Sequence, residues 1–275
     1  MVVLLSLCAA LTYGLSDFVG GVTSRRVSAW AVALMAQVGG ALTIPLLSLF
    51  THGSPTSADL GWALLAGVGN GVGTAFLYRG LAAGRMGVVA PVSGVGAALV
   101  PLVVGLSTGE RPAVLAWLGI LLALPAIWLV AREPTPGALT SSGLVDGVLA
   151  GVGFGTLFAA LAQIPEESGF LPLALNQAVG AALVALIATA VRAPWVPREA
   201  RAYVGMVSGV LGASATGLFL VATQTGFLTV AAVITSLYPA FTVVLAAALL
   251  REHVHRDQAI GLAMCAFAVG LIAAG

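Results

Sequence analysis

The sequence predicts an all-α membrane protein whose ten transmembrane helices form two inverted repeats of five helices each. Three observations lead to this fold class: the composition, the length of the apolar runs, and a match between the two halves of the chain. Hydrophobic residues make up 60% and charged residues 8% of the 275 residues, against about 45–50% and about 25% in a soluble domain. So few charges cannot cover a water-soluble fold of this size. Lipid must therefore surround most of the chain.

The apolar runs have the length and continuity of membrane helices. A spanning helix needs about 20 apolar residues, whereas strands of an outer-membrane barrel alternate apolar and polar residues in segments of about ten. Runs bounded by charges, Pro or Gly predict ten spans, near residues 2–22, 29–50, 60–80, 86–106, 112–131, 143–164, 170–191, 202–223, 228–250 and 257–274.

Most of the predicted spans end at a charge or a turn residue. In the first half the boundaries, in order, are Arg25-Arg26, the loop 51–59, the stretch from Arg79 to Arg85, Glu110-Arg111-Pro112 and the loop 132–142. In the second half they are Glu166-Glu167, the loop 192–201, the uncharged stretch 224–226 and Arg251-Glu252. The break at 224–226 is the least marked of these boundaries, because it carries no charge.

The two halves of the chain match each other at one nearly constant shift. At a shift of 141 or 142 residues the matched pairs are Tyr13-Gly14 with Phe154-Gly155, Val38-Gly39 with Val179-Gly180, Gly67 with Gly209, Thr74 with Thr216, and Glu110 with Glu252. Such self-similarity indicates a duplication, with residues 1–137 as the first repeat and 138–275 as the second. Because each repeat has five spans, the second enters the membrane upside down relative to the first, as in inverted-repeat transporters.

Three stretches resemble the EamA family of the drug/metabolite transporter superfamily. They are YGLSDFVGGVTSRR at 13–26, AAGRMGVVAPVSGVGAALVPLVVGLSTGERP at 82–112, and the second-half counterpart at 225–252. The resemblance implies a carrier of small metabolites, amino acids or drugs in the cytoplasmic membrane, often working outward. It also implies a cavity lined by the first, third and fourth spans of each half, and it leaves the substrate open.

The arginines predict the orientation of the chain. Loops after odd-numbered spans carry Arg25, Arg26, Arg79, Arg85, Arg132, Arg192, Arg198, Arg201, Arg251 and Arg256, and loops after even-numbered spans carry Arg111 alone. The positive-inside rule places the arginine-rich side in the cytoplasm and both termini outside. Many members of the resembling family are instead thought to keep both termini in the cytoplasm.

Asp17 is the acid placed deepest in a predicted span. It lies about 12 Å along the helix from Arg25, on one face with Tyr13. An intramembrane carboxyl is costly and tends to face a bundle interior or a wet cavity. We therefore expect Asp17 to bind a substrate ammonium or to carry a proton during coupling. The alternative is a structural role, as a hydrogen bond between helices or an ion pair with Arg79.

Further polar side chains are candidates for substrate binding. Asn70, Thr74 and Tyr78 follow one another at steps of four in the third span, and Thr216 is the repeat equivalent of Thr74. Each of these groups could instead link helices by a hydrogen bond worth about 0.6 kcal/mol. We expect a structural role for Gln37, Asn176 and Gln177.

The fourth and ninth spans carry residues that break helices. Pro91, Gly94, Gly96 and Pro101 lie in the fourth, and Ser236, Tyr238 and Pro239 in the ninth. Broken helices free backbone carbonyls that can face a transport cavity. We therefore add Ser93, Ser236 and Tyr238 to the candidate substrate-binding residues. Proline also occurs in passive spans, so packing remains the alternative.

Several function classes are not supported by the sequence. Nucleic acid is a poor fit as a partner because the net charge is +1 and the arginines are scattered. A P-loop needs a lysine, and the chain has none, so we expect no nucleotide-driven pumping. We expect no cofactor, metal site or catalytic residue. Glu110 and Glu252 are expected to anchor the first turn of the last span in each half.

The sequence thus favours a secondary transporter, most simply an exporter, of a small organic molecule that works by alternating access in the inner membrane. The partners expected are the solute, membrane lipid and, if transport is coupled, protons; the sequence does not define an oligomeric state. Two alternatives remain: an intramembrane enzyme acting on a lipid or isoprenoid, and a membrane subunit that does not transport.

Overall fold

A computed structural model describes residues 1–48, 53–82, 86–132 and 141–275, and every regular element in them is helical. In chain order the elements are α1 (Val2–Ser24), α2 (Ala29–Ser48), α3 (Ser57–Ala82), α4 (Met86–Ser107), α5 (Val114–Ala131), α6 (Ser141–Leu161), the 3₁₀ turn Glu166–Ser168, α7 (Leu171–Ala190), the 3₁₀ turn Ala200–Val204, α8 (Gly205–Gln224), α9 (Leu228–Thr235), α10 (Tyr238–Leu250) and α11 (Arg256–Ala274). Taking α9 and α10 together, ten helical segments in these ranges are long and apolar enough to cross a membrane, which confirms the predicted fold class.

The boundary between the loop 51–59 and α3 differs from the prediction. Asp59, expected in a loop, lies in the first turn of α3. Its carboxylate accepts hydrogen bonds of 2.8 Å from the backbone N–H and the hydroxyl of Thr56 and one of 2.7 Å from Ser168. An acid in this position satisfies backbone donors and favours the helix start. The polar residue therefore begins the helix rather than preceding it.

The ninth span is interrupted, whereas the fourth is not. Ser236 and Leu237 separate α9 from α10, and Pro239 follows in the first turn of α10, where its missing N–H costs no helical hydrogen bond. In the fourth span, α4 runs unbroken through Pro91 and Pro101, so these prolines do not divide the helix. Its neighbours α6, α9 and α5 pack along it and hold the helical path despite the lost hydrogen bonds.

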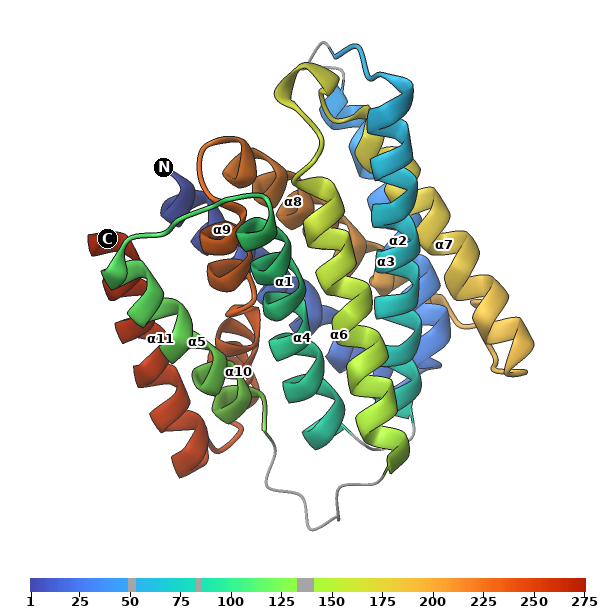
Figure 1. Ribbon diagram of the computed structural model, residues 1–275. Coiled ribbons are helices and arrows are strands. Elements are labelled where there is room, and N and C mark those ends of the chain that lie inside the picture. The colour runs from blue at the N-terminus through green and yellow to red at the C-terminus, as the bar shows by residue number, and fades with distance from the viewer. Residues whose placement is uncertain (49–52, 83–85, 133–140) are drawn as a thin grey trace.

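The two halves pack against each other with inverted symmetry. In Figure 1, α1 runs from the upper end of the molecule to the lower end and α6 runs the opposite way. The cross-half pairs are correspondingly reciprocal: α1 packs on α8 as α6 packs on α3, and α2 packs on α8 as α7 packs on α3. The last helices of the halves, α5 and α11, also pack together. The interior of the bundle is thus formed at the contact between halves.

Glycines allow the closest of these crossings. A Cβ at Gly209 in α8 would overlap the carbonyl oxygen of Ala36 in α2. Its repeat equivalent Gly67 in α3 meets Val179 of α7, where a Cβ would lie 2.6 Å from the valine Cβ. The same pair of helix contacts therefore depends on the same glycine in each half, as expected for small residues between membrane helices.

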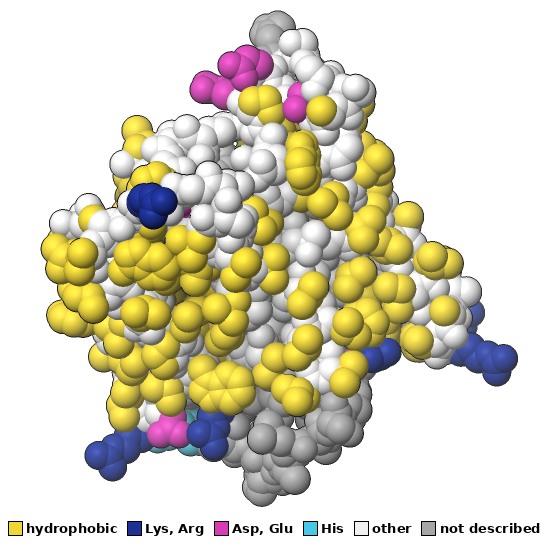
Figure 2. All heavy atoms as spheres, viewed as in Figure 1, with side chains coloured by type: hydrophobic (Ala, Val, Ile, Leu, Met, Phe, Trp, Pro, Cys, Tyr) yellow, Lys and Arg dark blue, Asp and Glu magenta, His cyan; other side chains and the backbone are white. Residues whose placement is uncertain are grey.

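Charge and hydrophobicity divide along the long axis of the bundle. Both termini lie toward its upper end (Figure 1). On the face in Figure 2, hydrophobic side chains form a wide middle band, and most of the basic side chains lie toward the lower end. This is the distribution required of a protein that spans a bilayer.

Candidate functional site

A cavity lined by both polar and aromatic side chains lies between the two halves of the bundle. Its lining comes from α1, α2 and α3 of the first half and α6, α7, α8 and α10 of the second, namely Tyr13, Ser16, Asp17, Ala36, Gln37, Asn70, Thr74, Leu77, Tyr78, Phe154, Leu157, Phe158, Gln177, Ser208, Gly209, Gly212, Thr216 and Tyr238. Both halves therefore contribute hydroxyl, amide and aromatic groups to one space.

Asp17 is the one charged side chain among the described residues that line this cavity. It is half-buried, and among the described residues no hydrogen bond or ion pair reaches its carboxylate. The ion pair with Arg79 that we considered is not formed. The Arg79 guanidinium is held instead by Asp146 of α6, with an Nε to Oδ1 distance of 2.8 Å, and lies 4.4 Å from the centre of the Phe76 ring. A carboxylate is thus presented to the cavity without a compensating protein charge.

Hydroxyl groups join α1 to α8 beside Asp17. The Tyr13 hydroxyl lies 2.7 Å from Thr216 Oγ1, and Ser16 donates to the backbone carbonyl of Ser208 at 2.8 Å. The Tyr13 ring is tilted against Tyr238 at 6.1 Å between ring centres and against Phe158 at 6.0 Å. These contacts fix the Tyr13 ring as part of the cavity wall, since Phe158 and Tyr238 bound it on two sides.

Amide side chains from α2, α3 and α7 form a hydrogen-bonded cluster at the cavity. Gln37 Nε2 donates to Asn70 Oδ1 and to Thr74 Oγ1, both at 3.2 Å. Asn70 Nδ2 in turn donates to Gln177 Oε1 at 3.1 Å and to Asn176 Oδ1 at 3.4 Å. The sequence favours a structural role for Gln37 and Gln177. They do connect helices, and they also line the cavity.

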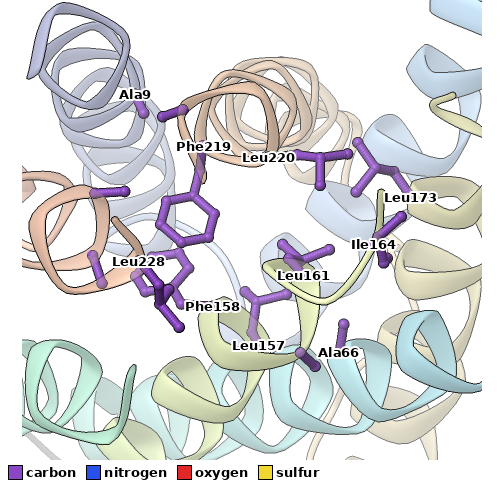
Figure 3. Close-up of a cluster of buried hydrophobic side chains, with 14 of the residues drawn as sticks. Ala9, Ala66, Leu157, Phe158, Leu161, Ile164, Leu173, Phe219, Leu220 and Leu228 are labelled. Atoms are coloured by element: carbon purple, nitrogen blue, oxygen red, sulfur yellow. The ribbon is translucent and has the colours of Figure 1, made fainter. Parts of the chain in front are cut away.

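A hydrophobic seal closes the cavity toward the end of the molecule that carries the termini. We use this name for the buried cluster in Figure 3, which includes Leu157, Phe158, Leu161, Ile164, Leu173, Phe219, Leu220 and Leu228, with Ala9 of α1 and Ala66 of α3. The Phe158 and Phe219 rings lie 4.5 Å apart between centres. Beyond the seal, Leu220 contributes to a second hollow that is lined by Glu166 and Glu167. The seal therefore lies between the central cavity and this second hollow.

The seal and Asp17 are related by the internal repeat. A shift of 141 residues places Asp17 of α1 at the position of Phe158 in α6. Leu77 of α3 similarly corresponds to Phe219 of α8 at a shift of 142. The two ends of the cavity are thus chemically different. The rings of Phe158 and Phe219 close one end, and Asp17 and Leu77 occupy the equivalent positions in the first half of the chain.

Most of the candidate residues come together at this cavity. Those that line it are Tyr13, Asp17, Asn70, Thr74, Tyr78, Thr216 and Tyr238. Ser93 and Ser236 do not belong to the lining: Ser93 donates to the Ala90 carbonyl at 3.0 Å, and the fully buried Ser236 hydroxyl has no hydrogen-bond partner among the described residues. Sequence reasoning missed Ser16 and the aromatic residues of α6. The repeat shift carries Tyr13 onto Phe154 and was the available signal for α6.

Glu110 has an unexpected partner. Pro112 does not begin α5, which starts at Val114. The Glu110 carboxylate instead caps α9 in the opposite half, where it accepts the backbone N–H of Leu228 at 2.6 Å and of Thr229 at 2.9 Å. Its repeat equivalent Glu252 forms an exposed ion pair with Arg25 at 2.8 Å. The expected anchoring of each acid to its own last span is therefore wrong.

Comparisons with known proteins agree with this architecture. The model of the EamA-like transporter family matches the chain twice, over residues 1–132 and 141–274. A solved structure described only as "Crystal structure of protein" has a TM-score of 0.74 and 18% sequence identity, and the alignment covers 99% of this chain and 98% of that one. At this identity the likeness shows the fold alone. A search of the curated proteins finds no significant match.

Proposed function

The chain belongs to the EamA-like transporter family, and from that premise we propose that it exports a small organic solute across the cytoplasmic membrane by alternating access. The solute is a metabolite, an amino acid or a drug that binds in the central cavity. Asp17, Tyr13, Asn70, Thr74, Tyr78, Thr216 and Tyr238 are the binding residues that we assign to it.

The observation that carries this proposal is the cavity at the contact between two inverted repeats, with hydroxyl, amide and carboxylate groups in its lining. Hydroxyl and amide groups in a membrane interior are costly unless they are satisfied or serve a ligand. In carriers built from inverted repeats, the binding site lies between the repeats. The two repeats can exchange conformations, so that the same site faces first one side of the membrane and then the other. The seal on one side of the cavity agrees with a carrier that exposes its site to one compartment at a time.

Protons are the coupling ion that we propose if transport is driven. Asp17 is the acid that would carry them, because it faces the cavity and no protein cation among the described residues pairs with it. Facilitated diffusion needs no such carrier. Flux into proteoliposomes with and without a pH gradient distinguishes the two modes: wild-type flux that follows the gradient, and flux in Asp17→Asn that ignores it, indicates coupling.

An intramembrane enzyme is the less favoured alternative. A hydrolase or transferase acting on a lipid would need several acid, base or nucleophilic groups at one depth. The cavity lining contains Asp17 alone among acids and bases of the described residues. A subunit without transport activity would tolerate apolar replacements at Asn70 and Thr74.

Reconstitution tests the proposed function. Purified protein in liposomes should give saturable uptake of at least one member of a panel of amino acids, aromatic metabolites and cationic drugs. Asn70→Leu should reduce that uptake, while Ser214→Ala, an exposed hydroxyl on α8 that bonds within its own helix, should leave it unchanged. Absence of uptake across the panel, with protein shown to be folded, would contradict the carrier proposal.

A further inference from the structure

We propose that the central cavity accepts organic cations: a protonated amine or a quaternary ammonium carried on an aromatic or other apolar body. This inference deepens the proposed function and rests on it. Its first basis is charge. The Asp17 carboxylate lines the cavity without a counter-charge from the described residues, while Arg79 is engaged by Asp146. In a medium of low polarity, an unpaired buried charge is strongly unfavourable. A cationic solute would supply the missing partner.

The second basis is the aromatic wall. Tyr13, Tyr78, Tyr238, Phe154 and Phe158 all contribute to the lining. Ring faces attract cations, by about 0.5–2 kcal/mol per contact depending on desolvation, and ring edges and faces pack against apolar groups. A carboxylate surrounded by tyrosine and phenylalanine rings is therefore suited to an ammonium group with an apolar body.

The lining also indicates which solutes are disfavoured. No Arg, Lys or His occurs among the described residues that line the cavity, so an anion would meet Asp17 without a compensating cation. The amide cluster of Gln37, Asn70 and Gln177 can satisfy neutral hydrogen-bonding groups. Polar neutral substituents on the cation are thus compatible with the site, whereas a free carboxylate or phosphate is not.

Three probes that share one ring test this preference. Benzyltrimethylammonium is a permanent cation, benzyl alcohol is neutral and phenylacetate is an anion. We expect equilibrium dialysis with the purified protein to show the cation bound at least about tenfold more tightly than the other two. Asp17→Asn should abolish the difference, and Asp17→Glu should retain it. The control Asp257→Asn removes an exposed acid outside the cavity and should leave all three affinities unchanged.

The outcomes separate this inference from the carrier proposal. Equal binding of the three probes, or a cation preference that survives Asp17→Asn, overturns the cation inference. The cation inference would also be overturned if proteoliposomes took up a neutral or anionic solute and Asp17→Asn left that uptake unaltered. The carrier proposal would stand in that case. Cation binding that requires Asp17 without any flux of the cation across proteoliposomes would support the site and contradict the carrier.

A second, independent observation concerns the two matched glutamates. Glu110 caps the first turn of α9 across the contact between halves, with both carboxylate oxygens engaged. At the repeat shift of 142, Leu228, where α9 begins, corresponds to Met86, where α4 begins. The equivalent acid Glu252 pairs with Arg25 instead, with both side chains substantially exposed. Among the described residues, an acid therefore caps the helix start at one end of the molecule, and its repeat equivalent at the other end does not.

We infer that Glu110 and Glu252 are alternate latches of the transport cycle. In the state that the structure describes, Glu110 caps α9 and holds closed the end of the molecule that carries the two termini. This contact lies next to the hydrophobic seal, to which Leu228 contributes. In the opposite state Glu252 leaves Arg25 and caps the start of α4, and Glu110 releases α9. Charge-assisted bonds to backbone N–H groups at a helix start are among the stronger hydrogen bonds, so one such contact at each end can bias the two states.

The test measures opening of the seal. Ala66→Cys places a thiol in the seal, where Ala66 is fully buried, in a background in which Cys8 and Cys265 are replaced by alanine. A membrane-impermeant maleimide is added on the side of the membrane that carries the two termini. Its reaction with the thiol reports that the seal has opened. We expect Glu110→Gln to speed labelling by roughly tenfold and Glu252→Gln to slow it, because each removes the latch of a different state. Glu166→Gln serves as the control and should have no effect.

Opposite signs for the two glutamates support the latch inference. A change of equal sign in both variants, or no change in either, overturns it, because a purely structural role would loosen the protein in both. Thermal unfolding of each variant in detergent shows whether the protein remains folded. The measurement needs no substrate, so it is independent of the cation inference.

Discussion

Asp146 is the acid whose loss should damage stability most clearly. Its side chain is 1% exposed, and it holds the Arg79 guanidinium between α3 and α6. Asp146→Asn leaves Arg79 without its counter-charge, which costs roughly 3–5 kcal/mol for a buried pair. Because the Arg79 side chain is 36% exposed, we expect the lower end of this range, measured by unfolding in mixed detergent.

The matched control for this prediction is the exposed pair of Arg132 and Asp257. Its nitrogen and oxygen lie 4.0 Å apart, with both side chains more than half exposed. Asp257→Asn should cost less than about 1 kcal/mol. Equal stability losses in the two variants would show that the α3 and α6 contact does not depend on this buried pair.

Single residues of the site could be predicted from sequence only where a charged or polar side chain is costly in a membrane-spanning helix. Asp17 stood out because a carboxyl in an apolar span is costly, and it does line the cavity. Ser93 and Ser236 were chosen from neighbouring prolines, which mark backbone irregularity and do not say which way a side chain points. The partner of Glu110 lies 118 residues away, at the backbone of Leu228, and no spacing rule connects the two.

Helix crossings depend on glycines that no larger residue can replace. A Cβ at Gly209 would overlap the Ala36 carbonyl of α2, whereas nothing lies within 4 Å of the Cβ position at Gly270 of α11. Gly209→Ala should force α8 away from α2 and destabilise the fold by about 1–3 kcal/mol. Gly270→Ala should stabilise it by up to about 1 kcal/mol through helix propensity.

Thermal unfolding of the two glycine variants in one detergent checks this prediction. A neutral Gly209→Ala would mean that α2 and α8 can separate without cost. Because α8 carries Ser208 and Thr216 into the cavity, Gly209→Ala should also weaken ligand binding. Gly270→Ala should not change it.

At the level of elements, hydropathy predicts where helices lie better than where they break. The ten spans follow from apolar runs because lipid leaves helices as the stable solution. The sequence did not distinguish the span that is interrupted, at Ser236 and Leu237, from the span that stays continuous, α4. Both segments contain proline, and the difference arises from the packing of neighbouring helices around α4.

The seal is a property of the whole bundle, since α1, α3, α6, α7, α8 and α9 all contribute to it. Phe219 is fully buried there and packs on Phe158. Phe219→Ala should remove the barrier between the cavity and the hollow near Glu166, and it should cost about 3–5 kcal/mol of stability. Proteoliposomes with this variant should leak benzyltrimethylammonium down its gradient.

Phe267→Ala is the control for the seal, because Phe267 of α11 is 65% exposed on the outside of the bundle. It removes the same side chain from a surface that faces lipid. A leak of the same size in both variants would indicate general loosening. A leak in Phe219→Ala alone supports the seal as the closed gate of the carrier.

Orientation is the last property of the whole molecule that the charges predict. The arginine-rich lower end in Figure 2 is opposite the end that carries both termini in Figure 1. The positive-inside rule then places the arginines in the cytoplasm and the termini outside, so that the seal closes the outer side and the cavity lies nearer the cytoplasm. A fluorescent protein fused after Gly275 should be dark, and alkaline phosphatase fused there should be active. The reverse pattern would place the seal on the cytoplasmic side and would make this conformation one that faces outward.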